Sequence, residues 1–177
     1  MVIVVTGAIA SGKSTIAREL ARELERVEVR AAVIDLDLVH DMITPLGSMS
    51  DDASWTLARR GLAMLANTFL ADGVAVVIAD GSFNSPGDRA ALARDLGADT
   101  DPVYVTLRVS FEEALRRAQS DPSRGISRDP DFLGSYFVAM GALLATVAPT
   151  DIVIDTEQMT ARSAAAAIAG LVRPDWT

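Results

Sequence analysis

Short, uninterrupted runs of apolar residues recur along the chain, and they are rich in β-branched side chains. Each run is too short for a helix and lacks the apolar–polar alternation of a half-exposed strand. This pattern is typical of strands covered on both faces in a parallel sheet. The runs predict strands at residues 2–5, 31–34, 74–78, 103–107 and 152–154.

Longer stretches with helical spacing of apolar residues lie between these runs. They predict helices at residues 13–25, 54–71, 86–96, 111–119, 132–147 and 159–171. In the first, Ile16, Leu20 and Leu24 repeat every four residues, which gives one apolar face that can pack on a sheet. The alternation of strands and helices predicts a three-layer, doubly wound α/β fold with five parallel strands. No repeat or linker interrupts it, so residues 1–177 are expected to form a single domain.

A glycine-rich segment, Gly7-Ala8-Ile9-Ala10-Ser11-Gly12-Lys13-Ser14-Thr15, follows the first predicted strand and opens the first predicted helix. It fits the phosphate-loop pattern G-x-x-x-x-G-K-[ST], in which backbone N–H groups and a helix N-terminus surround nucleotide phosphates. Lys13 is expected to reach the β- and γ-phosphates, and Ser14 to ligate Mg²⁺. The expected nucleotide contacts are Gly7, Ala8, Ala10, Ser11, Gly12, Lys13, Ser14 and Thr15.

Composition adds weight to one residue of this loop. The chain has 16 basic residues, and Lys13 is the only lysine among them. A codon bias that replaces lysine with arginine explains the rest of the set. At position 13 a compact ammonium is needed, because a planar guanidinium is too bulky to lie among the loop amides.

Several protein classes are excluded by what the sequence lacks. The net charge of -8 argues against general binding of nucleic acid or an anionic membrane, and the absence of cysteine removes disulfides and thiolate chemistry. With one lysine, the Asn-Lys-x-Asp guanine motif of GTPases cannot occur, and the Leu-Ser-Gly-Gly motif of transporter ATPases is absent. We expect a soluble, cytoplasmic monomer or homodimer that binds ATP and a small molecule.

Acidic residues follow the second predicted strand. Asp35 and Asp37 come where ligands bind in open parallel sheets, and they share one side if the strand continues that far. Asp37 is the candidate base that accepts the proton of an acceptor hydroxyl, and Asp35 is a candidate for positioning substrate or Mg²⁺. Both could instead cap a helix. His40, the only histidine, is a weaker substrate-binding candidate that could simply be a packing residue.

The third predicted strand leads into Asp80, Gly81 and Ser82. A carboxylate at this position, beside the phosphate-loop strand, is suited to hold the hydration shell of Mg²⁺. Asp80 and Ser82 are alternatively candidates for binding the acceptor. A plain turn is the remaining alternative for this segment.

Arginines gather after the fourth predicted strand. Arg117, Arg124 and Arg128 are the candidates to stabilise the charge that phosphoryl transfer spreads over three oxygens. They fall in a segment of about 117–131, bracketed by prolines, which is predicted to be a mobile lid. A solvated helix face paired with Glu112 and Glu113 is the alternative.

The phosphate loop, Asp37 with Asp41, the strand end at residues 78–83 and the arginines at 117 and 124 occur in an order similar to that of small P-loop kinases. The chain resembles the shikimate, gluconate and adenylylsulfate kinases, and most of all the chloramphenicol phosphotransferases. The resemblance implies an ATP- and Mg²⁺-dependent O-phosphotransferase with Asp37 as general base. Asp35-Leu36-Asp37 also looks like the Asp-Gly-Asp of adenylylsulfate kinases, although leucine replaces the glycine.

The leading hypothesis is therefore a kinase that phosphorylates a hydroxyl of a small organic molecule, with an antibiotic as one candidate. A nucleotide or adenylylsulfate kinase is the alternative, and it gains support if arginines line one cleft with Asp37. The arginines available for this are Arg59, Arg60, Arg89 and Arg94. A non-catalytic protein that senses ATP is the second alternative.

Overall fold

Five parallel strands form one sheet in the order β2-β3-β1-β4-β5. The computed structural model of the chain describes residues 1–43, 51–97, 100–147 and 151–172. The strands are β1 (Val2–Gly7), β2 (Ala31–Asp35), β3 (Val76–Asp80), β4 (Val103–Arg108) and β5 (Ile152–Asp155). In the central strand, Ile3 pairs with Ile78 on one side and Val103 on the other. The predicted doubly wound parallel sheet is confirmed.

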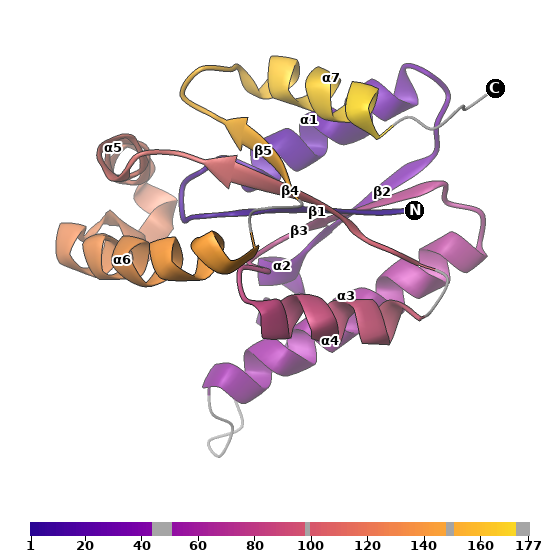
Figure 1. The fold of residues 1–177 in the computed structure, drawn as a ribbon, viewed down its shortest axis with the longest axis horizontal. Helices are drawn as coiled ribbons and strands as arrows, with labels where there is room; N and C mark the ends of the chain where they lie inside the picture. Colours follow the sequence, from indigo (N-terminus) through magenta and orange to yellow (C-terminus); the bar gives the residue numbers. More distant parts are fainter. Residues whose placement is uncertain (44–50, 98–99, 148–150, 173–177) are drawn as a thin grey trace.

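Helices cover both faces of the sheet and one of its ends (Figure 1). Helices α1 (Lys13–Glu25) and α7 (Ala161–Leu171) lie on one face, while α3 (Asp51–Ala71) and α4 (Pro86–Leu96) lie on the other. Beyond the carboxyl end of β4 are α5 (Phe111–Ser120), the 3₁₀ helix η1 (Pro122–Arg128) and α6 (Pro130–Val147). The short α2 (Leu36–Asp41) follows β2 directly.

The core has two apolar layers, one on each face of the sheet. The predicted face of α1, with Ile16, Leu20 and Leu24, is buried against β1, β3, β4 and α7. On the opposite face of the sheet, Leu62 of α3 and Leu92 of α4 pack against side chains of β1 and β3. Within the described ranges, no helix combines the length and apolarity that crossing a membrane requires.

Several element boundaries differ from the sequence prediction, and at two of them a capping side chain is the cause. Strand β2 ends at Asp35 because its Oδ1 accepts hydrogen bonds from the backbone N–H groups of Asp37 and Leu38 and starts α2. The strand does not continue to Asp37, so the two carboxylates do not share one strand face, and the alternative that Asp35 caps a helix is confirmed. The last helix begins at Ala161 rather than residue 159, because the Thr160 side chain caps it.

The proline-bracketed segment is helical rather than a plain loop. Residues 122–128 form η1, which is broken at Gly125 (φ 51°, ψ -129°). The flanking helices share a small apolar cluster in which Ala114, Ala118 and Leu133 pack against Ala10 of the phosphate loop. This cluster joins the predicted lid to the nucleotide-binding end of β1.

Candidate active site

The phosphate loop has positive φ angles at Gly7, Ala10 and Gly12. Gly7 has φ 144°, and a Cβ there would lie 2.5 Å from the carbonyl oxygen of Leu107, so only glycine fits. Gly12, with φ 96°, stands at the N-terminus of α1, and Ala10 also has a positive φ of 61°. Left-handed conformations in a loop of this kind allow successive backbone amides to face one anion-binding concavity. The loop therefore has the shape that nucleotide phosphates require.

Lys13 lies over this concavity. Its Nζ donates hydrogen bonds to the carbonyl oxygens of Gly7 at 3.2 Å and Ala8 at 3.1 Å. Burial lowers the pKa of Lys13, and the carboxylates of Asp80 and Asp37 oppose that shift. Among the described residues, the buried hydroxyl of Ser11 has no hydrogen-bond partner. Within the described residues, the ammonium donates to carbonyl oxygens and the Ser11 hydroxyl has no partner, and both features fit a triphosphate in the loop.

Asp80, at the end of β3, is suited to a site for Mg²⁺. Asp80 is buried, with 2% of its surface exposed. Burial raises the pKa of Asp80 to about 6, although a hydrogen bond from Ser14 and the charge of Lys13 both act to lower it. In the part of the chain that the structure describes, its Oδ2 lacks a hydrogen-bond partner and no three acidic or histidine side chains are grouped to hold a metal. Proteins bind Mg²⁺ through few carboxylates, several waters and substrate phosphates, so Ser14 and Asp80 fit that ion.

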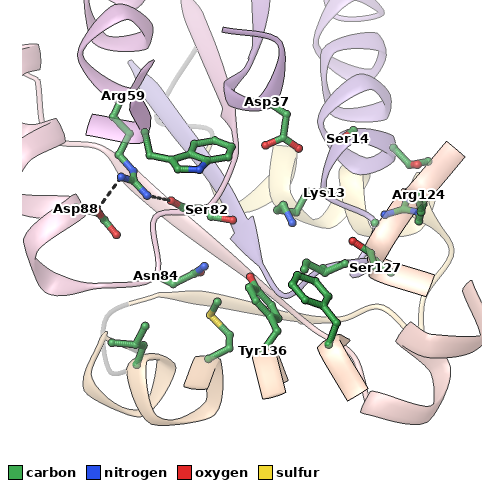
Figure 2. Close-up of a pocket in the computed structure, with 18 residues that line it drawn as sticks. Lys13, Ser14, Asp37, Arg59, Ser82, Asn84, Asp88, Arg124, Ser127 and Tyr136 are labelled. Carbon is green, nitrogen blue, oxygen red and sulfur yellow. Dashed lines mark hydrogen bonds and ion pairs between the residues drawn. The ribbon is translucent and has the colours of Figure 1, made fainter. Parts of the chain in front are cut away.

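Asp37 faces Lys13 across a cleft (Figure 2). It lies in the first turn of α2, and its position is fixed by the capping carboxylate of Asp35. Desolvation by the walls of the cleft raises the pKa of Asp37, while Lys13 works to lower it. Asp35 and His40 do not line this cleft. The His40 ring instead stacks on Trp55, with 3.9 Å between the ring centroids, and hydrogen-bonds to Ser54. His40 therefore packs against a residue that lines the cleft.

The cleft has a volume of about 590 Å³ and runs from the phosphate loop to α6. Its lining comes from segments far apart in the sequence. The lining residues are Ile9, Ala10, Gly12, Lys13, Ser14, Thr15, Asp37, Trp55, Arg59, Ser82, Asn84, Asp88, Arg124, Ser127, Phe132, Tyr136, Met140 and Leu143. Of the residues predicted to bind the acceptor, Asp37 and Ser82 line it, while Asp80 lies buried beneath the loop.

The wall opposite Lys13 contains Arg59, one of the four arginines named above for a nucleotide acceptor, together with Asp88 and Asn84, which the sequence did not single out. Arg59 of α3 forms an ion pair with Asp88 at 3.2 Å and donates to the carbonyl oxygen of Ser82 at 3.4 Å (Figure 2). The Oδ1 of Asn84 accepts a 2.8 Å hydrogen bond from Thr6. No motif links these positions, because they come from α3, α4 and the segment after β3.

The three predicted catalytic arginines lie in different places. Arg124 lines the cleft and is paired with Asp121 at 3.3 Å. Arg117 does not line it: its guanidinium donates to the Thr156 hydroxyl at 3.1 Å and carbonyl at 2.9 Å, and to Glu113 at 2.7 Å. Arg128 is exposed and outside the lining. The structure thus brings one of the three into the cleft with Lys13.

Comparisons with known proteins identify a family and similar folds. A family model described as an AAA domain (AAA_33) matches residues 2–124. The fold is similar to the crystal structure of APE1195, with 21% identity, a TM-score of 0.67 and coverage of 97% of this chain and 94% of that one. It is also similar to an unliganded sugar kinase from Janibacter sp. HTCC2649, with 21% identity, a TM-score of 0.65 and coverage of 96% and 92%. No curated protein sequence gives a significant match.

These structural likenesses show the fold, and the family match extends over the strand, phosphate loop and helix that form the nucleotide side of the cleft. The family model covers β1 through the start of η1, including Lys13, Asp37 and Asp80. The chain therefore belongs to the AAA domain family, with a P-loop kinase-like fold.

Proposed function

We propose that the protein transfers the γ-phosphoryl group of ATP to a hydroxyl of a small organic acceptor. One observation carries the proposal: Lys13 of the phosphate loop and the carboxylate of Asp37 line the same cleft, whose further half has room for a second substrate. An enzyme that only hydrolysed ATP would need no such second compartment. The P-loop kinase-like fold supports the proposal, as does the printed description of one structural neighbour as a sugar kinase.

In the proposed reaction the acceptor oxygen forms a bond to the γ-phosphorus while the bond to the bridging oxygen of ADP breaks. The hydroxyl proton passes to Asp37 and then to water, so the products are a phosphate monoester, ADP and a proton. Lys13 and the loop amides hold the phosphates, and Arg124 offsets negative charge on the transferred group. When Mg²⁺ is bound, it supplies charge neutralisation at the phosphates, with Ser14 and Asp80 as the residues that would hold it.

Incubation with ATP, Mg²⁺ and a panel of hydroxylated compounds tests this proposal. The panel includes sugars, nucleosides and antibiotics with a free hydroxyl, because an antibiotic is one candidate acceptor. We expect at least one compound to form a phosphate ester and to accelerate ADP release. ATP binding with no ester from any compound, and no acceleration of hydrolysis, would favour the alternative of a non-catalytic ATP sensor.

A further inference from the structure

The half of the cleft away from the phosphate loop has its own chemistry. It is walled by Trp55 and Arg59 of α3, by Asn84 and Asp88 near the start of α4, and by Tyr136 of α6 (Figure 2). This acceptor half is where a second substrate would lie, opposite Lys13. Its residues therefore determine which acceptors can bind.

The acceptor half offers no unpaired positive charge among the described residues that line it. Arg59 is the only arginine among the described residues of this half, and its guanidinium is neutralised by Asp88 at 3.2 Å. Both side chains are largely buried, at 20% and 27% exposed. In such surroundings an ion pair is stronger than at an open surface and is costly to break.

The other arginines of this region are either paired with carboxylates or lie outside the cleft lining. Arg89 forms a bidentate pair with Asp151, at 2.6 and 2.7 Å. Arg94 pairs with Asp95 at an exposed position, and Arg60 is exposed and outside the cleft lining. An acceptor that carries its own phosphate or carboxylate would thus meet no free cation there. The nucleotide-kinase alternative needs such a cation.

The polar groups in the acceptor half suit neutral hydroxyls. The Oδ1 of Asn84 already accepts from Thr6, and Figure 2 shows its amide nitrogen directed toward the middle of the cleft. The Arg59–Asp88 pair presents donors and an acceptor side by side, which matches two neighbouring hydroxyls. Tyr136 and Ser82 add hydroxyls at the same wall.

An apolar surface completes this half. The indole of Trp55 is held by the His40 ring, stacked at 3.9 Å with an interplanar angle of 13°. Phe132 and Met140 of α6 also line the cleft. Aromatic and aliphatic walls with a few placed polar groups are the usual means of binding a small, uncharged ring. A rigid indole can cover the carbon face of such a ring without losing side-chain freedom.

We propose that the acceptor is an uncharged, polyhydroxylated ring compound, and that Asp88 excludes anionic acceptors by neutralising Arg59. This inference rests on the proposed phosphotransferase function and deepens it. The carbon face of the acceptor packs against Trp55, its hydroxyls bind Arg59, Asp88 and Asn84, and one hydroxyl faces Asp37. An anionic acceptor loses its hydration in the cleft and gains no charge partner, so its binding is less favourable than that of an uncharged acceptor.

Matched pairs of acceptors test the inference directly. D-glucose is compared with D-glucuronate and glucose 6-phosphate, and adenosine and cytidine with their monophosphates, using labelled ATP to detect ester formation. We expect a neutral compound to be phosphorylated with a kcat/KM at least about tenfold above that of its anionic partner. Transfer only to anionic members overturns this inference and leaves the proposed function standing. Transfer to none of the compounds overturns the proposed function and this inference together.

Asp88→Asn then reverses the selection. The substitution frees Arg59, so binding of D-glucuronate should strengthen about tenfold or more while that of D-glucose weakens. Binding is followed by the fluorescence of Trp55 in a Trp176→Phe background, which removes the other tryptophan, with the nucleotide site filled by a non-hydrolysable ATP analogue. Asp95→Asn is the matched control on the same helix, because its partner Arg94 is exposed, and it should leave both affinities unchanged. An unchanged preference in Asp88→Asn overturns the inference.

Arg59→Gln gives an independent answer if Asp88→Asn fails to fold. For an uncharged acceptor, loss of the guanidinium removes hydrogen bonds to the acceptor but no charge attraction for it, and KM should rise by about tenfold with little change in the KM for ATP. A loss beyond about 10³-fold, restricted to anionic acceptors, would show that Arg59 binds a charge and would overturn the inference.

Discussion

Arg89 and Asp151 form a bidentate ion pair, with N–O distances of 2.6 and 2.7 Å, that joins α4 to the residue preceding β5. The Arg89 guanidinium also lies 4.1 Å over the ring of Tyr104, and its Nε donates to the carbonyl oxygen of Phe83. Thr106 donates a further hydrogen bond to Asp151. The pair therefore fixes the segment after β3, next to Asn84, that forms part of the cleft wall.

Asp151→Ala is expected to lower the free energy of unfolding by about 3–5 kcal/mol. The Asp151 side chain is 1% exposed and that of Arg89 is 11%, so the substitution leaves a buried, uncompensated guanidinium. Urea denaturation followed by circular dichroism measures the change. Asp95→Ala, which breaks the exposed pair with Arg94, should cost at most about 1 kcal/mol. Equal losses in the two variants would contradict a supporting role for the Arg89–Asp151 pair.

Lys13→Ala and Lys13→Arg should both lower kcat for phosphoryl transfer by about 10²-fold or more. Alanine removes the charge at the phosphates, and arginine is too large for the space beside the carbonyl oxygens of Gly7 and Ala8. Initial rates of ADP release in the presence of an acceptor measure the effect. The control is Arg22→Ala on the exposed side of α1. Full activity in Lys13→Arg would show that charge alone is sufficient at this position.

Asp37→Asn should lower transfer by about 10²–10⁴-fold and leave ATP affinity nearly unchanged. The carboxylate must be ionised to accept a proton. Desolvation raises the pKa of Asp37 above its ordinary 3.8, so wild-type activity should fall as the pH drops through that raised value. The residual activity of Asp37→Asn should lack this acid limb. Asp72→Asn, at an exposed position outside the cleft lining, is the control. An unchanged acid limb in Asp37→Asn would contradict the assignment.

Asp80→Asn should stabilise the nucleotide-free protein at neutral pH while impairing transfer. The folded-state pKa of about 6 lies above the ordinary 3.8, so folding favours the protonated form. The cost of ionisation is fully present above about pH 6 and disappears below about pH 4, where both states are protonated. We expect a gain of about 1–3 kcal/mol at pH 7.5 in EDTA, and none at pH 4. A gain of equal size at both pH values would contradict this account.

Arg124→Ala and Arg128→Ala separate two possibilities for the predicted lid. Arg124 lines the cleft, whereas Arg128 is exposed outside it. If residues 122–128 keep this conformation during turnover, Arg124→Ala should reduce kcat by about 10²-fold and Arg128→Ala by less than about threefold. Steady-state kinetics at saturating ATP distinguishes the two. Comparable losses would show that η1 rearranges and brings Arg128 to the phosphates.

The phosphate loop can be predicted from the sequence because its information is local. A contiguous motif contains Lys13 and Ser14, and apolar runs fix the strand that precedes it. The alternating strands and helices also sufficed for the parallel sheet. Asp35 shows where such local information is ambiguous. Asp-x-Asp fits both an extended strand and a capped helix, and only the start of α2 at Leu36 decides between them.

The acceptor half could not be predicted in the same way. Arg59, Asn84 and Tyr136 lie on three elements and no spacing connects them. Each is a common surface residue type in its own helix or loop, and it becomes a site residue only because the sheet order places α3 and α6 around one cleft. His40 was a plausible substrate ligand by type, yet stacking on Trp55 uses its ring.

The position of the only lysine makes the phosphate loop chemically unique in this chain. Reagents that acylate lysine side chains have one target in this sequence, Lys13. A lysine-specific protease likewise has one peptide bond to cleave, inside the nucleotide cradle. The intact mass of the protein, measured before and after such treatment, would therefore report whether a nucleotide occupies the phosphate loop.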